Sequence, residues 1–117
     1  LFEIRKRLLL TKLGLYNVSR KKVEKYSGGM KRRLSLILAL IHDPQIIFLD
    51  EPTIGMDPQS RRSVWDFIKE LKNENKTIFL TTHYMEEAET LCDRVGIVDF
   101  GKLLPLIPKK FDFKKWC

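Results

Sequence analysis

Two short apolar runs constrain the fold of this 117-residue chain more than any other feature. The first run, Ile46 to Leu49, lies between Pro44 and Pro52 and ends in Asp50-Glu51, and the second run is Thr77 to Leu80. Continuous apolar runs of this length are typical of strands that are buried in a parallel sheet. We therefore expect two buried strands at these positions.

Helical patterns alternate with the two runs. Gly14 is expected to end a first helix over 3–13, and Ser27 is expected to cap a second helix over 31–41. Asp57-Pro58 is an N-cap followed by proline at the first helical position, which is a common start of a helix. The other expected elements are a basic connector over 17–25, the end of the third helix at 73–75, a short helix over 84–91 and a third strand over 94–99. This order predicts an α/β fold with a largely parallel sheet and flanking helices.

The composition limits the chain to at most one domain, with enough apolar residues (44%) to build a core. The net charge of +7 is uneven, because residues 1–33 carry eleven Lys and Arg against two acidic residues, whereas residues 34–101 carry six against twelve. A basic first third raises the question of nucleic acid. The basic residues are not interleaved with aromatic residues and no nucleic-acid motif is present, so we expect no nucleic-acid partner.

Neither a secretory signal nor a membrane span is expected. The amino end lacks the charged, then apolar, then small-residue pattern of a signal, and the longest nearly continuous apolar run, Leu34 to Ile41, is far shorter than the ~20 residues of a membrane helix. Cys92 and Cys117 form no motif, and such isolated thiols fit a reducing cytosol better than a disulfide. Any association with a membrane is therefore expected to come through a partner.

Further motifs surround the two apolar runs. The segment Tyr26-Ser27-Gly28-Gly29-Met30-Lys31-Arg32-Arg33-Leu34-Ser35 precedes the first run, Gly55-Met56-Asp57-Pro58 follows it, and a lone His83 follows the second. In this order and spacing the motifs resemble the carboxyl-terminal half of an ABC-type ATPase domain, over roughly residues 5–104. The parts similar to the family's motifs are the signature loop (Ser27 to Met30), the Walker B strand (Ile46 to Glu51), the D-loop (Ile54 to Asp57) and the switch histidine (His83). The resemblance implies a partial P-loop NTPase fold.

The resemblance also implies roles for individual residues and two cofactors, ATP and Mg²⁺. Asp50 would serve Mg²⁺, Glu51 would act as the general base on the attacking water, and His83 would contact the γ-phosphate. The loop residues Ser27, Gly28, Gly29 and Met30 would reach ATP held by a second ABC ATPase domain in a head-to-tail dimer, and Asp57 would couple the two composite sites. Met30 departs from the family's commonest residue at that position, glutamine, and we do not expect this to inactivate the loop.

The phosphate-binding Walker A loop is not found. Gly96 to Lys102 fits the spacing G-x-x-x-x-G-K, but Leu103 follows where Ser or Thr would serve Mg²⁺, residues 96–100 resemble a strand, and no helix start follows. Only twenty-six residues precede Ser27, and the chain begins with Leu1. We therefore expect the chain to be a fragment that lacks the amino-terminal half of the domain.

The resemblance favours the ATP-hydrolysing subunit of a drug or lipid exporter, of the daunorubicin-resistance type or the eukaryotic A subfamily. Such a subunit works with a transmembrane permease and lies at the cytoplasmic face of a membrane. The alternatives are a soluble ABC-type ATPase of repair or translation and a remnant without catalysis. The expected domain layout is a helical and signature region over 1–42, a Walker B to switch-histidine core over 43–104, and a divergent or disordered tail over 105–117.

Overall fold

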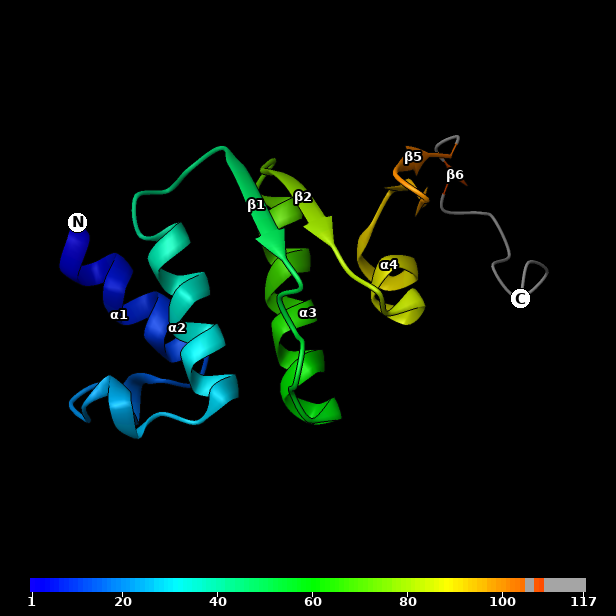
Figure 1. Ribbon diagram of the computed structural model, residues 1–117. Coiled ribbons are helices and arrows are strands. Elements are labelled where there is room, and N and C mark those ends of the chain that lie inside the picture. Colours follow the sequence, from blue (N-terminus) through cyan, green and yellow to red (C-terminus); the bar gives the residue numbers. More distant parts are fainter. Residues whose placement is uncertain (105–106, 109–117) are drawn as a thin grey trace. The chain divides into compact units, whose positions relative to one another are not determined.

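The computed structural model describes residues 1–104 and 107–108 (Figure 1). They fall into two compact units, Leu1–Thr81 and the part that begins at Thr82. The expected tail over 105–117 lies outside the described residues, apart from the backbone of Ile107–Pro108. Among the described helices, none is both long and apolar enough to cross a bilayer.

The first unit begins with two helices, α1 (Phe2–Lys12) and α2 (Gly28–Leu40), which pack against each other. Gly14 ends α1 as predicted, because its φ of +70° places it in the left-handed region that favours glycine. The amides of Gly14 and Leu15 donate to the carbonyls of Thr11 and Leu10, which is the Schellman pattern of a helix end. The connector between the helices contains two short 3-10 turns, η1 (Tyr16–Val18) and η2 (Val23–Lys25).

The two apolar runs form the strands β1 (Ile46–Asp50) and β2 (Thr77–Thr81). They pair in parallel, with Ile46 opposite Thr77 and Asp50 opposite Thr81. Helix α3 (Pro58–Asn73) connects them, as a parallel pair requires. The carboxyl ends of the two strands therefore meet at one edge of the sheet, which is where open α/β sheets bind ligands.

The prediction that these strands are buried is wrong for one face of the pair. Ile47 and Leu49 are buried, but Phe48 and Phe79 are 73% and 57% exposed and stack with their ring centroids 5.1 Å apart. A continuous apolar run predicts a strand but does not show whether one or both of its faces are covered. In the described part of this chain, only one face of β1 is covered.

Helix α3 begins and ends as the sequence predicts. The Asp57 carboxylate accepts a hydrogen bond from the Ser60 amide at 3.0 Å, and Pro58 occupies the first helical position. Asn75, with a φ of +61°, follows the end of the helix. One face of α3 is buried and supplies much of the core of the first unit: Val64, Trp65, Phe67, Ile68 and Leu71.

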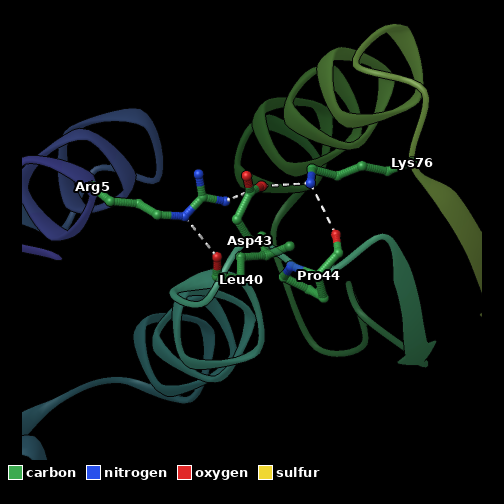
Figure 2. Close-up of polar contacts among 5 residues, drawn as sticks. All are labelled: Arg5, Leu40, Asp43, Pro44 and Lys76. Atoms are coloured by element: carbon green, nitrogen blue, oxygen red, sulfur yellow. Dashed lines mark hydrogen bonds and ion pairs between the residues drawn. The ribbon is translucent and has the colours of Figure 1, made fainter. Parts of the chain in front are cut away.

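A polar cluster joins three parts of the first unit (Figure 2). Asp43, in the loop between α2 and β1, accepts hydrogen bonds from Arg5 of α1 at 2.9 Å and from Lys76, just before β2, at 2.5 Å. Arg5 also donates to the Leu40 carbonyl, and Lys76, whose side chain is only 4% exposed, donates to the Pro44 carbonyl. Asp43 has a φ of +54°, so this loop holds a non-glycine residue in a costly conformation. The cluster thus ties the helical segment to the strands.

The second unit holds α4 (Met85–Leu91), with Glu86 and Glu87 in its first turn as predicted, followed by four two-residue strands. The prediction of one strand over 94–99 is wrong. β3 (Arg94–Val95) pairs antiparallel with β6 (Ile107–Pro108), and β4 (Val98–Asp99) pairs antiparallel with β5 (Lys102–Leu103).

The β4–β5 hairpin rules out Gly96 to Lys102 as a phosphate loop. Phe100 and Gly101, with φ of +47° and +73°, form its two-residue turn. Positive φ at both positions is the type I′ turn that suits a hairpin. Lys102 therefore lies in a strand, whereas the lysine of a phosphate loop lies at the start of a helix.

Candidate functional site at the carboxyl edge of the parallel strands

Asp50 and Glu51 stand where β1 ends, and Thr81 stands opposite them at the end of β2. The Thr81 hydroxyl donates a hydrogen bond to Asp50 Oδ1 and accepts one from the Glu51 amide at 3.2 Å. The Glu51 amide also donates to the Thr81 carbonyl at 3.0 Å. One threonine therefore fixes both acidic residues against the neighbouring strand.

The backbone changes direction at Glu51. Its φ of +47° places it in the left-handed region, which costs a non-glycine residue on the order of 1 kcal/mol. Asp50 is exposed, whereas Glu51 is half-buried. The two neighbouring carboxylates therefore have different surroundings and are suited to different roles.

The donor set at Asp50 fits Mg²⁺. This cation prefers carboxylate oxygens and keeps several waters, so one or two carboxylates together with substrate phosphates suffice to hold it. Among the described residues, no three His, Cys, Asp or Glu side chains gather into a protein-only metal cage. An exposed carboxylate whose position is fixed by Thr81 is the kind of partial site that a magnesium–phosphate complex completes.

The signature loop, residues 27–30, forms the amino end of α2. The Ser27 hydroxyl accepts a hydrogen bond from the Met30 amide at 3.2 Å, which is the predicted N-cap, although the helix begins at Gly28 rather than at Lys31. A Cβ built on Gly28 would have no neighbour within 4 Å, so its backbone is open to an approaching group. Open amides at the amino end of a helix suit an anion.

The D-loop lies beside the signature loop. A Cβ built on Gly29 would lie 3.8 Å from Cγ of Met56, which is itself buried. Gly55 has a φ of +74°, so the turn before Met56 uses the conformation that glycine tolerates best. Hydrogen bonds from Ser60, first from its side chain and then from its backbone, lower the pKa of the Asp57 carboxyl below its usual value, so Asp57 is ionised at neutral pH.

His83 belongs to the second unit, just before α4. Its ring lies 4.4 Å from the Tyr84 ring, measured between centroids, at a tilt of 36°. The Tyr84 amide donates to the Thr82 hydroxyl at 3.0 Å, which shapes the turn into the helix. The first unit thus brings Asp50 and Glu51 together, and Gly29 and Met56 together, while His83 stands in the second unit.

Sequence reasoning missed Thr81 as a site residue. The position of Thr81 in the sequence would have indicated it, because Thr81 follows the second apolar run as Asp50 follows the first. Parallel strands in register place such residues side by side, so a hydroxyl at this point meets the carboxylate.

The fold and these motifs define a nucleotide-binding α/β domain of the P-loop class. A family model described as "AAA domain, putative AbiEii toxin, Type IV TA system" matches residues 8–87. The chain is 45% identical, over 84% of its length, to the linearmycin resistance ATP-binding protein LnrL of Bacillus subtilis. It is 48% identical, over 82% of its length, to the daunorubicin resistance ATP-binding protein DrrA3 of Streptomyces coeruleorubidus. It is also 62% identical, over 67% of its length, to ABC transporter A family member 2 of Arabidopsis thaliana.

The chain belongs to the ABC-type ATP-binding domains, in agreement with the resemblance of its motifs. It spans 32% of LnrL, 30% of DrrA3 and 8% of the plant protein. A solved ATP-binding cassette of an ABC transporter shares its fold with a TM-score of 0.80 and 22% sequence identity, over 91% of this chain and 42% of that one. The predicted partial P-loop fold is therefore confirmed.

Proposed function

We propose that this chain supplies the carboxylate pair and the signature loop of an ATP-hydrolysing subunit that drives export of drugs or lipids. The observation that carries the proposal is the double hydrogen bond of Thr81, which fixes Asp50 and Glu51 at the carboxyl edge of the parallel strands. The names of LnrL and DrrA3 support the export role, since both are resistance ATP-binding proteins. Two further relatives are named as Nod factor export ATP-binding proteins.

Asp50 would hold Mg²⁺, and Glu51 would orient and deprotonate the attacking water. When bound, Mg²⁺ neutralises negative charge on the phosphates. Asp50 suits the cation because it is exposed and its second oxygen remains outside the Thr81 hydrogen bond. Glu51 suits the base because it is half-buried and its amide is held against β2 by hydrogen bonds to Thr81.

The remaining predicted residues would complete a site shared between two subunits. The Ser27 hydroxyl and the Gly28 and Gly29 amides would bind the γ-phosphate of ATP held by a second ABC ATPase domain. Asp57 would couple the two composite sites through the D-loop, and His83 would contact the γ-phosphate. Met30 would contribute to the loop through its backbone, because its amide donates to the Ser27 hydroxyl and so holds that side chain at the start of α2.

The full protein would work with a transmembrane permease at the cytoplasmic face of a membrane. The permease would choose the transported substrate. The alternatives are a soluble ABC-type ATPase of repair or translation and a remnant without catalysis, and a measurement of hydrolysis separates the remnant from the other two.

The deciding experiment replaces the proposed base in the longer protein that carries this chain. Glu51→Gln keeps the shape of the side chain but removes its ability to take a proton, so steady-state phosphate release should fall by about 10²–10⁴-fold. Binding of ATP, followed by equilibrium dialysis, should persist because the phosphate contacts remain. Glu89→Gln, an exposed change on α4, is the matched control and should leave hydrolysis unchanged. If Glu51→Gln retains more than about half of the activity, Glu51 is not the base.

A further inference from the structure

His83 and Tyr84 are consecutive residues whose rings lie against each other near the start of the second unit. Their centroids are 4.4 Å apart and their planes are tilted by 36°. Aromatic rings attract each other in offset and tilted arrangements of this kind. The contact engages the face of the imidazole, whereas the two imidazole nitrogen atoms lie at the ring edge, where hydrogen bonds are made. Tyr84 can therefore hold the imidazole while a nitrogen atom is presented to a ligand.

A turn of the backbone brings these two rings together. In an extended strand successive side chains point to opposite faces, so a strand that continued past Thr81 would separate them. The chain instead bends at His83, and the Tyr84 amide donates to the Thr82 hydroxyl at 3.0 Å. A hydroxyl that accepts from the amide two residues later makes a local turn through the side chain. Thr82 thus stabilises the bend that the ring contact requires.

The two rings differ in their exposure. His83 is exposed, whereas Tyr84 is half-buried and directly precedes α4. A side chain loses rotamer freedom when it is buried, so the tyrosine ring has fewer conformations than a fully exposed ring would have. Tyr84 therefore offers a fixed surface against which the exposed imidazole rests.

We infer that Tyr84 is the positioning residue of His83 and holds the imidazole in the orientation that meets the γ-phosphate. This inference rests on the proposed contact of His83 with that phosphate and adds the residue that prepares the contact. Without the tyrosine ring, the exposed imidazole would spread over several rotamers, and a smaller fraction would be oriented for ATP. An aromatic pair changes such a population by about two- to tenfold.

Nuclear magnetic resonance tests the orientation without catalysis, in the 117-residue chain itself. The chain holds two histidines, His42 and His83, so the loss of signals in His83→Gln assigns both imidazoles. Nuclear Overhauser contacts should join the His83 and Tyr84 rings. Tyr84→Leu should move the His83 signals toward those of the exposed His42, whereas Tyr84→Phe keeps a ring and should leave them in place. Missing contacts between the rings, or His83 signals that Tyr84→Leu does not move, would overturn the inference.

The same substitution elsewhere separates a local effect from a general one. Tyr16→Leu removes a tyrosine ring from the η1 turn of the first unit and should leave the His83 signals in place. The far-ultraviolet circular dichroism of both leucine variants should match that of the unmodified chain. A Tyr16→Leu chain whose His83 signals move as far as those of Tyr84→Leu would overturn the inference, because the signals would then report the fold as a whole.

Steady-state hydrolysis by the longer protein tests whether the orientation matters. Tyr84→Leu should lower kcat by about two- to tenfold, and Tyr84→Phe should restore it. A double-mutant cycle with His83→Ala shows through which group Tyr84 acts. In the His83→Ala background Tyr84→Leu should cost nothing further, because no imidazole is left to position. Equal losses in the two backgrounds would overturn the inference, since Tyr84 would then act independently of His83.

Failure of the proposed function has a different signature from failure of this inference. If His83→Ala leaves hydrolysis unchanged, the proposed role of His83 is wrong, and the spectra still decide whether Tyr84 holds its ring. If His83→Ala impairs hydrolysis while Tyr84→Leu changes neither the spectra nor the rate, the proposed role of His83 stands and the inference about Tyr84 is overturned.

Discussion

At the scale of single residues, one hydroxyl determines how the acidic pair is presented. Thr81 accepts from the Glu51 amide and donates to the Asp50 carboxylate, so it acts on both residues without being an acid or a base itself. Glu51 then adopts a left-handed conformation that only its surroundings can maintain. Strain of this kind, at the residue proposed as the base, is common where geometry matters more than stability.

Thr81→Val should raise the Mg²⁺ concentration required for half-maximal ATP hydrolysis by the longer protein. Valine keeps the shape but cannot donate to Asp50, and the loss of a hydrogen bond to a charged group corresponds to roughly tenfold in affinity. A magnesium titration of steady-state hydrolysis measures the change. Thr81→Ser keeps the hydroxyl and is the control, which should restore the original requirement. An unchanged titration for Thr81→Val would show that Thr81 does not position the metal ligand.

At the scale of elements, α2 buries one side and exposes another, as two of its leucines show. Leu40 of α2 is fully buried, whereas Leu38, two residues earlier, is 64% exposed. A helix turns by about 100° per residue, so positions two apart point to different sides. The same helix therefore packs into the fold with one side while another side faces water.

Leu40→Ala should destabilise the chain by about 2–5 kcal/mol, because it leaves a cavity in a packed region. Leu38→Ala should change stability by no more than about 0.5 kcal/mol, since its side chain faces water in the folded chain as well. Urea unfolding followed by circular dichroism measures both variants in the same way. Similar losses for the two variants would contradict the burial described for α2.

The Arg5–Asp43–Lys76 cluster joins elements that are distant in sequence, and its effect depends on pH. The pKa of Asp43 lies below its ordinary value of 3.8. The largest cause is the hydrogen bond from Lys76, and the charge of Arg5 is the next cause that lowers this pKa. Because the folded pKa is lower than the unfolded one, the contribution to stability is fully present above about pH 4 and is lost as the pH falls through the folded pKa.

Asp43→Asn should lower the free energy of unfolding at neutral pH and reduce its dependence on pH below about 4. Asparagine lacks the negative charge with which Asp43 pairs with both Arg5 and Lys76. The substitution therefore leaves the buried Lys76 ammonium without its counter-ion. Urea midpoints measured from neutral to strongly acidic pH check this directly. Asp66→Asn, on the exposed side of α3, is the matched control. A control that behaves like Asp43→Asn would assign the effect to net charge alone.

At the scale of the whole molecule, the chain holds a carboxylate pair and a signature loop but no Gly-x-x-x-x-Gly-Lys motif that the structure supports as a phosphate loop. The β4–β5 hairpin takes the one segment of the sequence with that spacing. The exposed face around Phe48 and Phe79 is also apolar, which places an uncovered sheet surface beside the carboxylate edge.

The 117-residue chain alone should therefore bind ATP weakly in the presence of Mg²⁺. Asp50 and the open amides of α2 supply single contacts, and no group of the first unit encloses the phosphates of a nucleotide bound in cis. Equilibrium dialysis checks this. A dissociation constant in the low micromolar range, about −8 kcal/mol, would contradict the prediction and return attention to Gly96 to Lys102.

The amino-acid sequence was sufficient to predict the order of elements as far as α4, the two caps at Ser27 and Asp57, the end of α1 at Gly14, and the family. These features depend on contacts within a few residues, or on spacing, so local chemistry specifies them. The tertiary structure alone decided which face of β1 is buried, that Thr81 meets Asp50, and that residues 94–99 are two short strands in different pairs. Burial and pairing depend on what lies across the fold, and neighbours in space leave no periodic trace in a single sequence.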